Sequence, residues 1–201
     1  LYSSIKQRIN KLLQSQQAHA LCGGLKGLEK ESLRVNPEGK IAQTPHPFSL
    51  GASLTNPYIT TDYSEALMEF ITPPFSDVKD SISFMEALHT YTYQHLGDEL
   101  LWGTSMPCVV DGEKSIPIAD YGQSNIGQMK HIYRVGLWHR YGRSMQAIAG
   151  IHFNYSLPET FWPIYQQIEG DTQPSQDFIS ERYLDMTRNL HRYGWLVLFL
   201  F

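Results

Sequence analysis

The stretch LKGLEKESLRV, residues 25–35, decides the fold class of this chain. Apolar and polar residues alternate along it, and the turn sequence NPEG follows at residues 36–39. Alternation with a period of two is typical of a strand, because successive side chains point to opposite faces of a sheet. We therefore expect a strand over residues 25–35, and a hairpin that turns back into residues 40–43.

The two glutamates of this strand lie on the same face as its apolar residues. Glu29 and Glu31 alternate in step with Leu33 and Val35, whereas Lys30 points to the other side. Two like charges close together on a core-facing surface are costly unless a cation neutralises them. Oxygen ligands of this kind are those that magnesium prefers. The alternatives are a shift of strand register, or lysines and arginines from elsewhere in the chain that pair with the acids.

A second acidic strand is expected over residues 65–72, where Pro73 ends it. Glu65 and Glu69 lie on its apolar face, and Asp62 comes shortly before it. Because acids recur on a core-facing side, the pattern indicates that both strands line one cation-filled cavity. Carboxylates around divalent metals are what nucleotide phosphates need during phosphoryl transfer.

A third strand is expected over residues 144–157. One face is apolar throughout, and the other carries Gln146, Gly150, His152 and Asn154. A solvated outer face usually carries Lys and Glu, so this composition favours a strand that buries its apolar side and lines a polar site with the other. A histidine such as His152 is more often a structural residue, but opposite the carboxylates it becomes a candidate nitrogen ligand or phosphate donor.

Apolar residues at helical spacing predict the remaining elements. Helices are expected over residues 1–17, from Ser76 or Asp77 to Leu96, over 128–141, and from about 175 onward. Strands and helices mix without a strict βαβ rhythm, which favours an α+β fold with an antiparallel or mixed sheet. Both ends of the sequence look cut, and the apolar run at residues 195–201 is expected to be a buried element whose packing partners lie outside the chain.

Composition and motifs exclude several functional classes. The 201 residues include 16 Lys and Arg against 20 Asp and Glu, a formal charge of -4, so neither a nucleic acid nor an anionic membrane is indicated as a partner. Cys22 and Cys108 form no metal-ligating pair and are typical of reduced cytoplasmic thiols. Residues 1–17 lack the apolar run of a signal peptide or a membrane span. The chain contains no GxxxxGK[ST] or GxGxxG motif, so ATP use cannot be inferred from a phosphate loop.

Five stretches of the chain resemble the proteobacterial type of glutamate–cysteine ligase. They are GLEKESLRV at 27–35, TTDYSEALMEFITP at 60–73, SMPC at 105–108, YGQSN at 121–125 and GIHFNYSLP at 150–158. Their order and spacing also fit, and the resemblance extends over nearly the whole chain. It implies that residues 1–201 are the amino-terminal part of a single, longer catalytic domain. The fold it implies is α+β, with a curved, largely antiparallel sheet that forms a funnel flanked by helices and is related to glutamine synthetase.

The same resemblance implies a reaction and a set of site residues. The reaction is ATP-dependent ligation of the γ-carboxylate of L-glutamate to the amine of L-cysteine through a γ-glutamyl phosphate, the first step of glutathione biosynthesis. The ligands of Mg²⁺, or of Mn²⁺, would be Glu29, Glu31, Asp62, Glu69 and His152. The amino-acid substrates would lie against Tyr133, Arg134, Gln146 and Ile148, with Asn154 on the same strand face. No residue need act as a nucleophile, and the implied full-length enzyme is a cytoplasmic monomer.

Two other functions stay open at this stage. The chain could belong to another carboxylate–amine ligase of the same fold that uses a different amine. It could also be an inactive fragment that only binds metal, because the resemblance places a further metal carboxylate, a phosphate-binding arginine and part of the cysteine pocket beyond Phe201. We therefore expect the isolated chain not to catalyse ligation.

Overall fold

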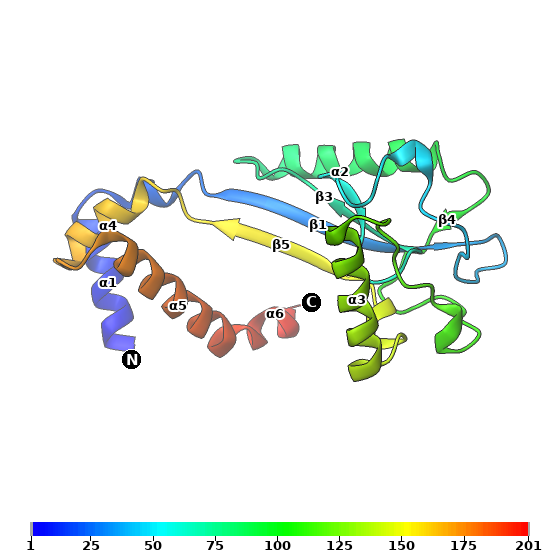
Figure 1. Cartoon of the computed structure of the whole chain (residues 1–201). Coiled ribbons are helices and arrows are strands. Elements are labelled where there is room, and N and C mark those ends of the chain that lie inside the picture. Colours follow the sequence, from blue (N-terminus) through cyan, green and yellow to red (C-terminus); the bar gives the residue numbers. More distant parts are fainter. Residues whose placement is uncertain (1, 201) are drawn as a thin grey trace. The chain divides into compact units, whose positions relative to one another are not determined.

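The computed structural model describes residues 2–200, which form two compact units. The first, here called the helical unit, combines Leu1–Gly24 with Ser156–Phe201. The second, here called the sheet unit, is Leu25–Tyr155. Both units are drawn in Figure 1. That they act as parts of one catalytic domain stays a prediction.

Among the described residues, the sheet unit contains a five-stranded sheet. Its strands are β1 (Leu25–Val35), β2 (Ile59–Thr61), β3 (Leu67–Ile71), β4 (Leu100–Leu101) and β5 (Ile151–Ser156). The order is β2-β3-β1-β4, and β5 also pairs with β1, beside which it runs in Figure 1. The pairs β1–β3, β1–β4 and β2–β3 are all antiparallel. The expected α+β fold with a largely antiparallel sheet is therefore confirmed.

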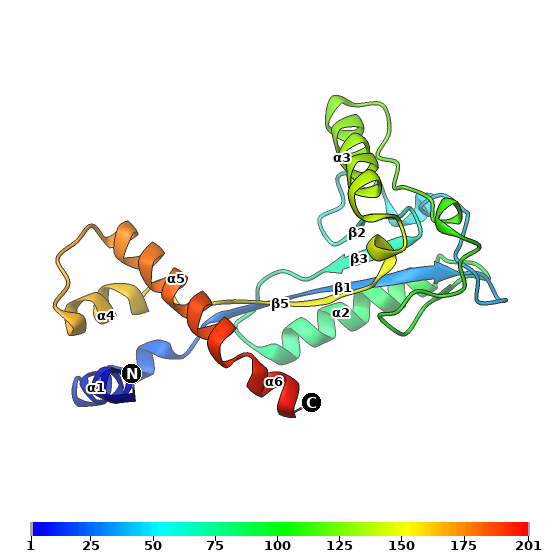
Figure 2. The same ribbon diagram turned by 90° about the horizontal axis from the view of Figure 1, so that it is seen from below.

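Helix α2 (Val78–Tyr93) covers one face of this sheet, along β1 and β3 (Figure 2). It begins where expected, because the Asp77 side chain accepts a hydrogen bond from the Lys79 amide. Met85 and Leu88 of the helix pack in one core cluster with Phe70 of β3. The burial of this face leaves the opposite face of β1 and β3 to the acidic residues.

Helix α3 (Asn125–Tyr141) begins a few residues before the predicted start, at an N-cap formed by Ser124. Gly127 in its first turn has no room for a side chain, because an added Cβ would stand 2.4 Å from the Tyr121 carbonyl oxygen. The start of α3 is therefore pressed onto the backbone of Tyr121.

The carboxyl-terminal half of β1 is buried on both faces. Leu33 and Val35 belong to one hydrophobic cluster, while Arg34, only 1% exposed, points the other way. The Arg34 Nη1 donates to the Glu99 carboxylate at 2.7 Å, and its Nη2 donates to the Glu65 carbonyl oxygen at 3.1 Å. A charge buried this deeply is tolerated only because it is paired and hydrogen-bonded.

The helical unit and the short 3₁₀ turns complete the chain. Its helices are α1 (Tyr2–Gln14), α4 (Phe161–Glu169), α5 (Ser175–Tyr193) and α6 (Trp195–Leu200), and the 3₁₀ turns are η1 (Ala18–Leu21), η2 (Phe48–Leu50), η3 (Glu113–Ser115) and η4 (Met145–Ala147). Phe161, Trp162 and Phe178 form the centre of the helical core. Helix α4 was not predicted from the sequence. In the described part of the chain, no helix is long and apolar enough to cross a membrane.

Two of the predicted strands are shorter than expected. Glu65 is not in a strand but in the turn between β2 and β3, where its carboxylate accepts hydrogen bonds from the His46 and Asp120 amides. The third strand begins only at Ile151, because residues 145–147 form the turn η4. In both places the sequence keeps alternating between apolar and polar residues, but backbone hydrogen bonds close a turn there, so the chain does not form a strand.

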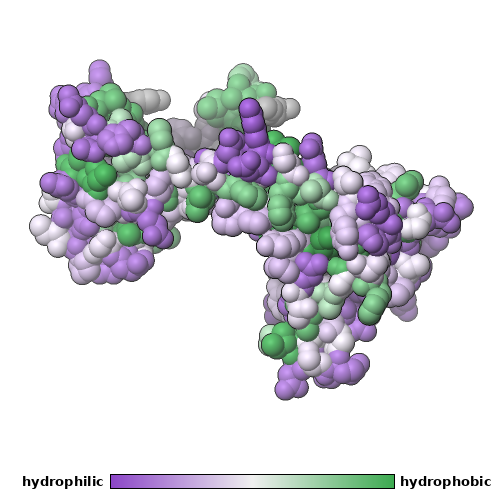
Figure 3. Space-filling view, turned by 90° about the horizontal axis from the view of Figure 1, so that it is seen from above, coloured by the Kyte–Doolittle hydropathy of each residue, from purple (hydrophilic) through white to green (hydrophobic). Residues whose placement is uncertain are grey.

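The predicted burial of the apolar face of the third strand was wrong, whereas the apolar run of α6, expected to pack against partners outside the chain, lies exposed within it. On β5, Ile151 is 68% exposed and Phe153 is 62% exposed. Helix α6 has no buried residue, and Leu198 is 86% exposed. Figure 3, coloured by the hydropathy of each residue, shows apolar residues on the surface beside hydrophilic ones. Apolar and polar residues do alternate in the sequence of β5. Its apolar side chains stay exposed because α2 packs on β1 and β3 rather than on β5.

A candidate metal and substrate site

Acidic residues from three segments gather on the face of the sheet that α2 leaves open. Glu31 of β1 lies directly opposite Glu69 of β3 in the antiparallel register, and Glu69 is also paired with Thr60 of β2. Asp62 directly follows β2. The charges of Asp62, Glu31 and Glu29 all act on the Glu69 carboxyl group. The structure therefore places on one face the four acids that the family resemblance implies as metal ligands, Glu29, Glu31, Asp62 and Glu69, here called the acid cluster.

Strand β5 supplies two polar side chains to Glu29. His152 Nδ1 lies 2.9 Å from Glu29 Oε2, and Asn154 Nδ2 donates to Glu29 Oε1 at 2.8 Å. Since residues 152 and 154 alternate on one face of the strand, both reach the carboxylate that protrudes from the same face of β1. The predicted proximity of His152 to the acids is thus present in the structure.

Gly150 binds Glu31 through its backbone. The Gly150 amide donates to Glu31 Oε2 at 2.6 Å, and the Glu31 amide donates to the Gly150 carbonyl oxygen at 2.9 Å. A Cβ at this position would stand 3.2 Å from His152 Nε2, tighter than most real contacts of a Cβ. Glycine therefore leaves room for the His152 imidazole beside the Glu31 carboxylate, where the sequence had suggested the approach of a ligand.

The charge of the four acids is not balanced by any lysine or arginine of the described chain. Burial raises the pKa of Glu69 to about 7, and the negative charges of Asp62, Glu31 and Glu29 add to that rise. Burial also raises the pKa of Glu31, against the lowering effect of the Gly150 amide. The hydrogen bond to Glu29 raises the pKa of His152. Within residues 2–200, no lysine or arginine forms an ion pair with any of the four acids.

Donor type and charge suit a divalent cation, but the side chains are not arranged as a closed cage. No group of three or more His, Cys, Asp or Glu in the described residues stands close enough to hold a metal ion. Glu29 and Glu31 are instead held by the protein donors of Asn154 and Gly150. The oxygen-rich face, which has no lysine or arginine partner among the described residues, fits Mg²⁺ in the chemistry of its donors, with two of its carboxylates engaged by the protein.

The residues expected to contact substrate fall into two groups. Arg134 and Asn154 are bound to the acid cluster, because Arg134 Nε donates to the Asp62 carbonyl oxygen at 2.5 Å and Asn154 donates to Glu29. The others lie outside these hydrogen bonds, with Tyr133 64% exposed, Ile148 38% exposed and Gln146 half-buried in η4. No role was expected for Tyr121, although it lies in the stretch YGQSN, which was part of the family resemblance.

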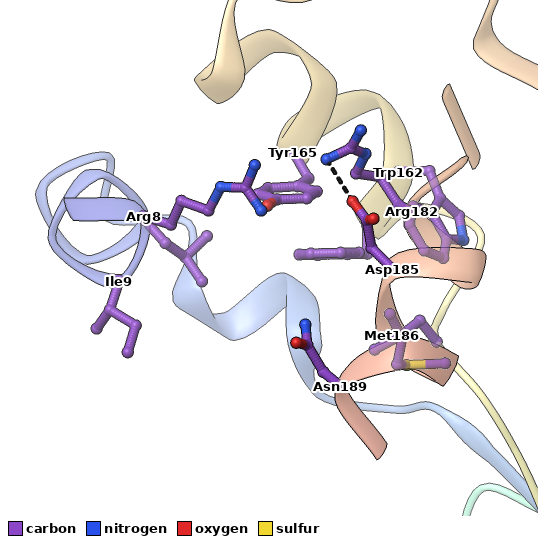
Figure 4. Close-up of a pocket in the computed structure, with 11 residues that line it drawn as sticks. Arg8, Ile9, Trp162, Tyr165, Arg182, Asp185, Met186 and Asn189 are labelled. Atoms are coloured by element: carbon purple, nitrogen blue, oxygen red, sulfur yellow. Dashed lines mark ion pairs between the residues drawn. The ribbon is translucent and has the colours of Figure 1, made fainter. Parts of the chain in front are cut away.

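The helical unit contains a separate cavity of about 330 Å³ between α1, α4 and α5 (Figure 4). Apolar and aromatic side chains such as Trp162 and Met186 line it. Its acid, Asp185, is paired with Arg182 at 2.8 Å. Because that charge is already neutralised, the cavity lacks the unbalanced acids of the sheet unit.

Comparison with known proteins decides the family. The sequence pattern of the family described as "Glutamate-cysteine ligase" matches residues 9–201. The chain belongs to the glutamate–cysteine ligase family. A glutamate–cysteine ligase from Alcanivorax borkumensis is 57% identical over 197 residues, which are 98% of this chain and 38% of that protein. The chain thus spans little more than a third of the length of this relative.

Solved structures agree with this assignment to the glutamate–cysteine ligases. The Francisella tularensis glutamate–cysteine ligase, crystallised in complex with AMP, superposes with a TM-score of 0.80 at 38% identity, over 87% of this chain and 34% of that one. A bifunctional glutathione synthetase from Pasteurella multocida superposes with a TM-score of 0.84 at 31% identity, over 95% of this chain and 25% of that one.

The raised pKa of Glu69 leads to a prediction about stability. The folded-state pKa of about 7 lies above the usual value of 4.5, so the native state binds the proton more tightly than the unfolded state. Stability should therefore fall as the pH rises through this range. In the metal-free protein, Glu69→Gln should raise the melting temperature by a few degrees at about pH 8 and change it little at about pH 4.

Thermal denaturation in the presence of EDTA measures this difference. Added Mg²⁺ should reduce the difference in melting temperature between the two proteins at high pH, because a bound cation takes the place of the proton on Glu69. Equal melting temperatures of the two proteins across the whole pH range would contradict an uncompensated charge at Glu69.

Proposed function

We propose that this chain supplies metal- and substrate-binding residues of an ATP-dependent glutamate–cysteine ligase. The reaction joins the γ-carboxylate of L-glutamate to the amine of L-cysteine. The observation that carries the proposal is the group of four acids on one sheet face, without a lysine or arginine partner in the described residues, in a chain of this family. An acidic surface of this kind suits a substrate that brings its own cations and phosphates.

The reaction proceeds in two steps that need no nucleophile from the protein. The glutamate side-chain carboxylate attacks the γ-phosphorus of ATP, which releases ADP and forms an acyl phosphate. The amine of cysteine then attacks the acyl carbon, loses a proton and expels phosphate. The work of the chain is to position these groups and to balance their charge.

Each residue of the acid cluster has a proposed task. Glu29, Glu31, Asp62 and Glu69 would hold the divalent cation, with His152 as a further ligand. When bound, Mg²⁺ would supply positive charge to the phosphate oxygens. Asn154 and the Gly150 amide orient two of the carboxylates by direct hydrogen bonds. Tyr133, Arg134, Gln146 and Ile148 are proposed to border the amino-acid substrates, although Arg134 already binds the Asp62 backbone.

The nucleotide, the compartment and the oligomeric state belong to the same proposal. ATP is supported by AMP in the Francisella tularensis relative. A cytoplasmic location is supported by the two free cysteines, Cys22 and Cys108. A monomeric full-length protein is proposed from the family resemblance.

The direct test replaces the matching part of the Alcanivorax borkumensis ligase with residues 1–201 of this chain and keeps the remainder of that ligase. The replaced part is 57% identical to this chain over 197 residues. We call the resulting protein the family-length hybrid. It should release ADP only when both glutamate and cysteine are present, and γ-glutamylcysteine should form in equal amount. ADP release that depends on glutamate and another amine, but not on cysteine, would favour a different carboxylate–amine ligase. A folded hybrid without any glutamate-dependent ADP release would contradict the proposed function.

A further inference from the structure

The hydroxyl group of Tyr121 is bound to the end of β2, next to the acid cluster. Tyr121 is 6% exposed, and its hydroxyl donates to the Thr61 carbonyl oxygen at 2.7 Å, with the Asp62 carbonyl oxygen at 3.1 Å. The Thr61 Oγ1 donates to the same hydroxyl at 3.1 Å. A buried hydroxyl with three polar contacts on two consecutive residues restrains the backbone of those residues.

Side chains of helix α3 contact the ring of Tyr121, and one of them also binds the Asp62 carbonyl oxygen. Lys130 Nζ lies 4.9 Å and Arg134 Cζ 4.7 Å from the centre of the Tyr121 ring. Cations at this distance from an aromatic face are attracted to it. Arg134 Nε also donates to the Asp62 carbonyl oxygen at 2.5 Å. Two side chains from different segments thus converge on the carbonyl group of one acidic residue.

The backbone of Asp62 is consequently held on both sides. Its amide donates to the Leu67 carbonyl oxygen at 3.0 Å, across the turn that joins β2 to β3. Its carbonyl oxygen accepts from Arg134 Nε and shares the single proton of the Tyr121 hydroxyl with the Thr61 carbonyl oxygen. Because both peptide groups are fixed, the direction in which the Asp62 side chain leaves the backbone is fixed as well.

We infer that Tyr121 and Arg134 are positioning residues that aim the Asp62 carboxylate at the cation site. The inference rests on the proposed function, since it needs a cation at the acid cluster. It gives Arg134 a task that differs from the substrate contact implied by the family resemblance. Residues that fix metal ligands in this way commonly change metal affinity by about 10- to 100-fold when they are replaced.

The chain offers a closely matched control for this idea. Tyr63 is also buried, at 1% exposure, and is the residue next to Asp62. Its hydroxyl has no hydrogen-bond partner among the described residues. Tyr63→Phe and Tyr121→Phe therefore remove the same atom from similar surroundings, but only Tyr121→Phe removes hydrogen bonds to the Asp62 segment.

The experiment measures Mn²⁺ affinity of the family-length hybrid by electron paramagnetic resonance, without nucleotide or amino acid. Tyr121→Phe should weaken binding about tenfold or more, and Tyr63→Phe should leave it unchanged. Because no substrate is present, loss of a substrate contact cannot produce this result. Circular dichroism and melting temperature of each variant establish that the fold is intact.

Arg134→Lys provides a second, independent variant. Lysine keeps a positive charge near the Tyr121 ring but lacks the Nε–H that Arg134 donates to Asp62. It should also weaken Mn²⁺ binding about tenfold or more, and this variant decides the matter if Tyr121→Phe does not fold.

Three results would overturn the inference. Unchanged Mn²⁺ affinity in folded Tyr121→Phe and Arg134→Lys would show that the hydrogen bonds to Asp62 do not matter to the site. An equal loss in Tyr63→Phe would show a general packing effect. Absence of Mn²⁺ binding in the unsubstituted hybrid would overturn the proposed metal site, and the inference with it.

Discussion

Glu29→Gln in the family-length hybrid is expected to lower magnesium-dependent ligation by at least about 10²–10³-fold, the range seen when one preorganised electrostatic group is removed. The substitution removes one negative charge with almost no change in shape. The fold should survive, because Gln still accepts a hydrogen bond from Asn154, which donates to Glu29 Oε1 at 2.8 Å. The rate of ADP release at saturating Mg²⁺ measures the effect.

A matched control for this substitution is Glu38→Gln, which makes the same chemical change in the exposed turn after β1. It should leave turnover within about twofold of the unsubstituted value, because an exposed charge contributes little. Unchanged turnover in Glu29→Gln at saturating Mg²⁺ would rule out a direct role of Glu29 in holding the cation.

Much of the acid cluster could be predicted because its cause is local. The alternation in β1 placed Glu29 and Glu31 on one face, and the structure pairs Glu31 with Glu69 and Glu29 with His152. Strand parity depends only on the backbone geometry of each strand, so it can be read from the residues. The family resemblance then implied which of these acids hold the metal.

The limits of the sequence prediction have equally physical reasons. Glu65 continues the alternation of β3, but the Leu67 amide bonds to the Ser64 carbonyl oxygen and closes a turn there. The hydrogen bond between Tyr121 and Asp62 joins residues far apart in the chain, so no periodicity in the sequence could predict it. The exposure of Phe153 depends on which layer covers β5, and alternation does not contain that information.

The isolated 201-residue chain is expected to show no ligase turnover and to self-associate. The activity proposed here belongs to proteins of which this chain matches 38% in Alcanivorax borkumensis and 34% in Francisella tularensis. Apolar side chains also lie exposed on β5 and α6, among them Phe153 at 62%, Leu198 at 86% and Phe199 at 78%. Exposed apolar patches of this kind drive association.

Light scattering of the purified chain and an assay of ADP release test both parts of this prediction. Phe153→Glu and Leu198→Glu should lower the apparent mass if these surfaces cause the association. A monodisperse monomer with turnover near that of the family-length hybrid would show that residues 1–201 hold a complete site.

The most direct test of the cation site is calorimetric titration of Mg²⁺ into the family-length hybrid near neutral pH, in buffers of different ionisation enthalpy. With a pKa of about 7, Glu69 carries a proton in part of the molecules, and a bound cation must displace it. We predict saturable Mg²⁺ binding with release of a fraction of a proton, and Glu69→Gln should remove the proton release and weaken the binding. Absence of saturable binding, or binding unchanged by Glu69→Gln, would contradict a cation site at the acidic face of the sheet.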